Sequence, residues 1–177
     1  GLNLAPGLRR DFAAEKWPNI SRPYWEKVRA EAQELIKKDI SLEIAGFDID
    51  DEALSLARYH AREAGVDKYI HFQRRSVAEL QSKKKYGHII CNPPYGERLE
   101  EVKAVECLYK EMGQVFKRLD SWSYFILASH PRFEYFFGRR ADKNRKLYNG
   151  RIETHYYQYF GPRPFGKPSP SKDTVYN

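Results

Sequence analysis

Residues 89–99 read Ile-Ile-Cys-Asn-Pro-Pro-Tyr-Gly-Glu-Arg-Leu. The apolar residues at the start of this run predict a short buried strand. Two consecutive prolines follow, and neither can donate a hydrogen bond to a sheet ladder or continue inside a helix. The strand is therefore expected to end in a stiff corner at Asn92. In open α/β sheets this carboxyl end of a strand is the usual place for a ligand.

Polar and flat groups gather in this corner. Asn92 carries an amide oxygen, Pro93 and Pro94 carry carbonyl oxygens, and Tyr95 carries an aromatic face. Two acceptors and one ring suit a planar base with an exocyclic amino group, because the acceptors can take both N–H bonds while the ring stacks on the base. The alternative is a proline-stiffened turn without any chemistry.

Strand-like and helix-like segments alternate along the rest of the chain. Apolar or alternating runs predict strands at 44–50, 69–74, 86–91 and 122–128, and helical spacing of apolar residues predicts helices at 23–38, 51–64, 102–119 and 131–137. Such alternation implies right-handed βαβ units and a parallel sheet. The segment 122–128 is very apolar and is expected at the centre of that sheet.

The last predicted elements form a hairpin. Asn149-Gly150 lies between two strand-like runs, 146–149 and 152–160, and is typical of a type I′ turn. The sequence thus predicts one α/β domain over residues 1–161 that ends in an antiparallel hairpin. Residues 162–177, rich in proline, serine and lysine, are expected to form a flexible tail.

Composition narrows the class of protein. The chain has 177 residues, enough for one domain with a core, and a net charge of +7, which favours a polyanionic partner. Its apolar runs are too short to span a membrane. We therefore expect no membrane partner. Cys91 and Cys107 lie in apolar segments without metal or redox spacing, so we expect buried, reduced thiols in a cytoplasmic protein.

The run Asn92-Pro93-Pro94-Tyr95 resembles motif IV of the S-adenosylmethionine-dependent amino-methyltransferases. Residues 92–99 as a whole are similar to the THUMP-associated (UPF0020-type) group, which methylates guanine N2 in large-subunit rRNA and is often labelled N6-adenine-specific DNA methylase. The resemblance implies a Rossmann-like class I methyltransferase sheet, mostly parallel with a C-terminal antiparallel hairpin. It also implies S-adenosylmethionine as cofactor, rRNA as partner, and the four residues 92–95 as the catalytic corner, where Asn92 also contacts the cofactor.

Three further residues correspond to cofactor contacts of that family. Asp48 ends the strand at 44–50, where a carboxylate can accept both ribose hydroxyls of an adenosine. Ile49 would then lie against the adenine ring. Capping the next helix is the alternative for Asp48, although Asp50 and Asp51 can already fill that role. Ser76 occupies the place of an acid that contacts the adenine amino group; a helix cap is its alternative.

One part of the family pattern is absent. The glycine-rich loop that follows the first strand of the family has no counterpart, because the sequence contains no Gly-x-Gly. Residues 2–8 resemble the segment that comes after that loop. The resemblance therefore implies a C-terminal fragment that lacks the first strand and an upstream RNA-binding THUMP domain. We expect such a fragment alone to bind S-adenosylmethionine poorly and to be inactive.

Two other functions remain open. An N6-adenine-specific DNA methyltransferase can use the same four residues at 92–95. A non-catalytic RNA-binding module is favoured by the missing glycine-rich loop and by Ser76. The cations between residues 139 and 146 suit phosphate contacts, with a plain solvated loop as the alternative.

Overall fold

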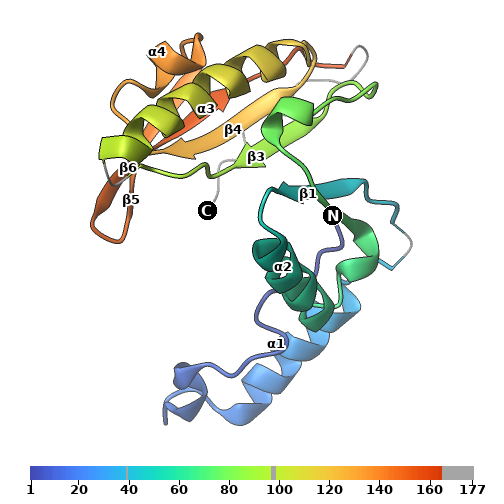
Figure 1. Cartoon of the computed structure of the whole chain (residues 1–177). Helices are drawn as coiled ribbons and strands as arrows, with labels where there is room; N and C mark the ends of the chain where they lie inside the picture. Colours follow the sequence, from blue (N-terminus) through green and yellow to red (C-terminus); the bar gives the residue numbers. More distant parts are fainter. Residues whose placement is uncertain (39, 97–98, 165–177) are drawn as a thin grey trace. The chain divides into compact units, whose positions relative to one another are not determined.

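A computed structural model describes residues 1–38, 40–96 and 99–164 of the chain (Figure 1). The chain consists of two compact units, Gly1–Arg74 and Arg75–Asn177. No helix among the described residues is long and apolar enough to cross a membrane. The predicted flexible tail falls almost entirely on residues 165–177, which lie outside the described part, as do Glu97 and Arg98 of the run that follows the prolines.

The first unit contains two parallel strands and two α-helices. Its elements are η1 (Ala13–Lys16), α1 (Arg22–Glu34), β1 (Ile44–Asp48), α2 (Asp51–Glu63), η2 (Asp67–Tyr69) and β2 (Ile70–Arg74). β1 pairs with β2 in parallel, from Ile44 opposite Ile70 to Asp48 opposite Arg74. α2 buries Leu54 and Ala61. These elements match the predicted strands and helices of this part of the chain, although α1 ends at residue 34 rather than 38.

Part of the apolar stripe along α1 is not covered. Val28 and Leu35, the residue after the helix, share the helical spacing of Trp25, yet they are 58% and 62% exposed. The contacts of α1 are made instead with the N-terminal loop, where Trp25 stacks on Phe12 at 5.7 Å between ring centroids. Arg29 donates hydrogen bonds to backbone carbonyls of the same loop. A two-stranded sheet is too narrow to cover the apolar stripes of two helices, which accounts for the difference.

The second unit is a four-stranded sheet with helices on one face. Its elements are η3 (Val77–Glu79), β3 (His88–Cys91), α3 (Leu99–Lys117), β4 (Ser123–Ala128), α4 (Phe133–Phe137), β5 (Lys143–Asn149) and β6 (Ile152–Tyr159). The strand order is β3-β4-β6-β5, in which β3 and β4 run parallel and the other two pairs are antiparallel. α3 and α4 lie on the same side of this sheet (Figure 1).

Alternating residues of the two middle strands form the core of this unit. Tyr124, Ile126 and Ala128 of β4 and Tyr157 and Tyr159 of β6 are buried together with the inner faces of α3 and α4. The α/β fold with parallel strands and a C-terminal antiparallel hairpin is therefore confirmed, as is the inner position of β4. The described strands nevertheless form two separate sheets, of two and four strands, rather than one.

The hairpin differs from its prediction at the turn. β5 begins at Lys143, three residues earlier than expected, and Asn149 pairs with Ile152, so the turn consists of Gly150 and Arg151. Gly150 has a φ of +62°, whereas Asn149 is not among the residues with positive φ. A positive φ at only the first turn position is typical of type II′ rather than type I′. Glycine takes this conformation without a steric penalty, so the register follows Gly150.

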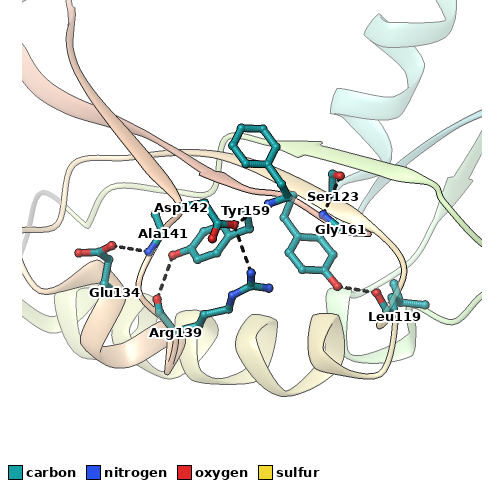
Figure 2. Close-up of polar contacts among 10 residues, drawn as sticks. Leu119, Ser123, Glu134, Arg139, Ala141, Asp142, Tyr159 and Gly161 are labelled. Carbon is teal, nitrogen blue, oxygen red and sulfur yellow. Dashed lines mark hydrogen bonds and ion pairs between the residues drawn. The ribbon is translucent and has the colours of Figure 1, made fainter. Parts of the chain in front are cut away.

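The base of the hairpin is held by hydrogen bonds from the loop that joins α4 to β5 (Figure 2). The carboxylate of Asp142 accepts from the Arg139 guanidinium at 3.2 Å and from the backbone N–H of Phe160 at 2.7 Å. The hydroxyl of Tyr159 donates to the carbonyl of Arg139 at 3.1 Å. Both arms of the hairpin therefore start from a fixed position.

Candidate functional site

The predicted corner lies at the carboxyl end of β3. Cys91 is the last residue of that strand, and residues 92–96 continue without regular secondary structure. Asn92 and Pro94 are exposed, while Pro93 and Tyr95 are partly buried. The corner is thus accessible to a ligand, as the chemistry assigned to it requires.

A buried tyrosine of α3 holds the backbone of the corner in place. Tyr109 of α3 is fully buried, and its hydroxyl donates a hydrogen bond to the carbonyl oxygen of Pro94 at 3.3 Å. Burial raises the pKa of Tyr109 to about 12, so the hydroxyl keeps its proton and remains a donor at neutral pH. Gly96 allows the loop to approach α3 closely, because a Cβ there would lie 3.1 Å from Val102 Cα. These contacts fix the backbone on both sides of Tyr95.

A second contact comes from the end of β5. The side-chain amide of Asn149 donates to the hydroxyl of Tyr95 at 3.4 Å. The tip of the hairpin therefore lies beside the aromatic ring on which a base would stack.

Sequence reasoning did not assign a role to Tyr109 or to Asn149. Tyr109 could have been found, because it shares the helical spacing of Val105, Met112 and Phe116 on the buried face of α3. Asn149 looked like an ordinary turn residue, and nothing local to it points to Tyr95.

His130, which had no assigned role, lies next to Tyr109 in the core. Its Nδ1 accepts from the backbone N–H of Arg132 at 3.1 Å, so the ring proton lies on Nε2, which faces Glu106 Oε1 at 3.4 Å. The ring packs edge-on against Tyr109 and Phe136. His130 thus helps to fix the tyrosine that supports the corner.

Cys91, next to the corner, is partly buried, whereas Cys107, which was expected to be buried, is exposed. Burial raises the pKa of the Cys91 thiol to about 12. The neutral thiol is a poor nucleophile, and it persists throughout the physiological range because the thiolate is disfavoured in an apolar environment. The corner thus offers hydrogen-bond acceptors and an aromatic ring, next to a neutral thiol.

Asp48 and Ile49 are exposed at the carboxyl end of β1 in the first unit. Asp48 Oδ1 accepts from the backbone N–H of Asp50 at 3.0 Å, and Asp50 itself caps α2 by accepting from the N–H of Glu52 at 2.9 Å. The capping alternative for Asp48 is thus filled by Asp50. Ile49 is 66% exposed. The contacts of Asp48 with the ribose and of Ile49 with the adenine of an adenosine cofactor stay predictions.

Ser76, in the second unit, has the geometry of a helix cap. Its Oγ accepts from the backbone N–H of Ala78 at 3.3 Å, and its own N–H donates to Glu79 Oε2 at 3.0 Å, which completes a capping box. This was the alternative interpretation from the sequence. A contact between Ser76 and adenine stays a prediction.

Comparison with known proteins identifies the class. Residues 1–158 match the family model of the RMKL-like methyltransferase domain (UPF0020). YpsC of Bacillus subtilis, which bears the name of an RNA methyltransferase, is 47% identical over 160 residues, which cover 90% of this chain and 42% of YpsC. The ribosomal RNA large subunit methyltransferase K/L of Legionella pneumophila is 37% identical over 157 residues, which cover 88% of this chain and 22% of that protein.

Solved structures agree with this class. A methyltransferase named SMU.472, crystallised in complex with SAH, has a TM-score of 0.86 and 45% identity over 92% of this chain and 43% of its own. A protein of Listeria monocytogenes, named as an N6-adenine-specific DNA methylase, has a TM-score of 0.83 and 44% identity over 92% of this chain and 42% of its own.

The fold, the corner and these matches define an S-adenosylmethionine-dependent methyltransferase domain. The chain belongs to the RMKL-like methyltransferase domain family, which confirms the family predicted from residues 92–99. It spans less than half the length of the relatives described above.

Proposed function

We propose that the protein to which this chain belongs transfers a methyl group to the exocyclic amino group of a nucleobase, namely N2 of guanine in large-subunit rRNA. The observation that carries the proposal is the exposed Asn92 corner, whose backbone Tyr109 fixes through Pro94. The relative from Legionella pneumophila, named as a large-subunit rRNA methyltransferase, supports RNA as the substrate.

The corner has the groups that this reaction requires. The target nucleotide leaves its stack, and its base lies on the ring of Tyr95. Its amino nitrogen is a poor nucleophile, because its lone pair is conjugated with the ring. Asn92 Oδ1 and the Pro93 carbonyl accept the two N–H bonds and draw the nitrogen towards tetrahedral geometry, which frees the lone pair. S-adenosylmethionine would supply the electrophilic methyl group: the N–CH3 bond forms as the S–CH3 bond breaks, the sulfur leaves as a neutral thioether, and the nitrogen loses one proton to water. Positioning of the base and the oriented acceptor dipoles would account for the rate.

Nucleoside analysis of the reaction product tests this assignment. The full-length protein is incubated with labelled S-adenosylmethionine and with either unmethylated large-subunit rRNA or duplex DNA. We expect label in RNA, as N2-methylguanosine. Label in DNA as N6-methyladenine would instead establish the second candidate, which the name of the Listeria monocytogenes relative favours. Labelled methyl groups on a ring carbon of a base would contradict the proposal, and so would the absence of label from both RNA and DNA.

We further propose that the 177-residue chain needs an additional strand for cofactor binding. Among the described strands, β1 pairs only with β2, and β3 pairs on one side only, with β4. The backbone N–H and C=O groups on an open strand edge are normally paired with another strand or covered. A further strand from the longer protein, followed by a glycine-rich loop, would pair with an open edge of this kind.

Calorimetry with S-adenosylmethionine tests the need for this strand. We expect the full-length protein to release heat on binding, whereas the chain alone gives no measurable heat at the same concentration, because the chain alone lacks the glycine-rich loop whose backbone approaches the cofactor. Equal affinity of both proteins would contradict the need for a further strand. No heat from either protein would favour the RNA-binding module over the enzyme.

A further inference from the structure

The β5–β6 hairpin extends past the sheet towards the corner. β4 ends at Ala128, which lies opposite His155, so residues 152–154 of β6 and their partners 147–149 of β5 continue beyond it. Asn149 at the end of this extension donates to the Tyr95 hydroxyl. A nucleotide chain whose target base stacks on Tyr95 would therefore pass over the hairpin tip.

The hairpin tip has the charge of a polyanion-binding element. The tip, residues 145–151, reads Arg-Lys-Leu-Tyr-Asn-Gly-Arg, with three cations and no acid. β5 is the outer strand of the four-stranded sheet, and all seven of its residues are exposed. Arg145 and Arg151 present guanidinium groups, which bind phosphates through paired hydrogen bonds.

An exposed aromatic ring lies among these cations. Tyr148 is 65% exposed, and the Lys146 ammonium lies 5.4 Å from the centre of its ring. Lys146 also pairs with Glu153 at 2.6 Å, which fixes the ammonium over the ring. Cations that follow the backbone and a ring on which a base can stack are the features of single-stranded nucleic acid binding.

The hairpin is positioned before any ligand binds. Asp142 and Tyr159 tie its base to the loop after α4 (Figure 2). A surface on a fixed element binds without the entropy cost of ordering a loop.

We propose that this hairpin tip, residues 145–151, is the surface that binds the RNA strand beside the target nucleotide and so places its base on Tyr95. The inference rests on the proposed function, since it names the part of the protein that holds the substrate. Lysines on an edge strand also prevent strands of different molecules from pairing. That role would not depend on RNA, so an RNA-binding measurement separates the two.

The test uses the full-length protein and two charge-reversal pairs. R145E/R151E removes both guanidinium groups of the tip. K83E/K85E is the matched control, because it changes the net charge of the same unit by the same amount. Its two residues are exposed and lie before the amino end of β3, whereas the corner follows the carboxyl end of that strand. Binding of an unpaired large-subunit rRNA fragment is followed by fluorescence anisotropy over a range of salt concentrations, and methyl transfer by label incorporation.

For R145E/R151E we expect RNA affinity to fall at least tenfold and the slope of log Kd against log salt to decrease by about 2. KM for RNA should rise by a similar factor, whereas kcat at saturating RNA and calorimetric affinity for S-adenosylmethionine stay unchanged. Y148A should weaken RNA binding about 5- to 100-fold through lost stacking, with the same salt slope.

Three results would overturn the proposal. The first is R145E/R151E with wild-type affinity and salt slope, and the second is an equal loss in K83E/K85E. The third is a loss of kcat without a change in RNA affinity. Anisotropy measures binding without turnover. A protein that binds RNA through the tip but methylates nothing would therefore contradict the proposed function, while it would still support RNA binding by the tip. Both variants change exposed residues, so thermal unfolding within about 3 °C of wild type is expected.

Discussion

Replacement of Asn92 by alanine in the full-length protein is expected to lower kcat for methyl transfer by about 100- to 1,000-fold, a range typical of removing one aimed hydrogen-bond group from an active site. The amide oxygen of Asn92 is one of the two acceptors assigned to the amino group of the base. Without it, the nitrogen keeps its conjugation and the lone pair does not face the methyl group. The remaining acceptor, the Pro93 carbonyl, is backbone and is unaffected by the substitution.

The fold should survive this change, because Asn92 is exposed at the end of β3. We expect the free energy of unfolding to change by less than about 0.5 kcal/mol. N92D, which retains an acceptor oxygen, should recover part of the lost rate. The measurements are kcat and KM with rRNA, together with urea unfolding. Unchanged methyl transfer by a folded N92A protein would eliminate the mechanism proposed for the corner.

Substitution of Gly113 by alanine is expected to destabilise the full-length protein by about 3 kcal/mol or more, as overpacking of a tight contact does at the upper end of its range. A Cβ on Gly113 would overlap the backbone carbonyl oxygen of Phe137. Because that oxygen is backbone, α3 and α4 have to separate. The core that they share includes Phe116 and Phe133, both buried. Separation of the helices would open this core.

The sign of the stability change in G113A tests the close contact between α3 and α4. In an exposed helix, exchange of glycine for alanine stabilises by about 1 kcal/mol, because glycine loses more backbone entropy on folding. The contact with Phe137 therefore has to reverse the sign. Q114A, at the exposed neighbouring position of α3, is the control and should change stability by less than about 0.5 kcal/mol. Urea unfolding of both variants decides the matter, and a stabilised G113A protein would show that α3 and α4 are not in close contact.

Local sequence patterns were sufficient for most of the elements. Apolar spacing predicted the strands and helices of both units, since burial of one face dictates the periodicity of the chain. The two prolines after Asn92 predicted a stiff, irregular corner from covalent structure alone, because neither has a backbone N–H. The resemblance of residues 92–99 predicted the family, which the family match and the relatives confirm.

Sequence patterns that are compatible with two different local structures were less informative. Asn149-Gly150 is compatible with more than one hairpin register, and the pairing of Asn149 with Ile152 selects the turn at Gly150 and Arg151. The spacing of Val28 and Leu35 indicates an apolar helix face, but it does not reveal what covers that face. Ser76 suits both an adenine contact and a helix cap, and the backbone of Ala78 and Glu79 makes it a cap.

The sequence by itself determined the chemistry that the corner offers: an amide, two proline carbonyls and a tyrosine ring at the end of a strand. Only the tertiary structure decided which groups support that corner. Tyr109 reaches Pro94 from a helix 15 residues away, and Asn149 reaches Tyr95 from a hairpin 54 residues away. Such contacts follow from the packing of α3 on the sheet and from the pairing of β5 within it, because the partner of a side chain across space depends on the register of whole elements and not on its neighbours in the chain.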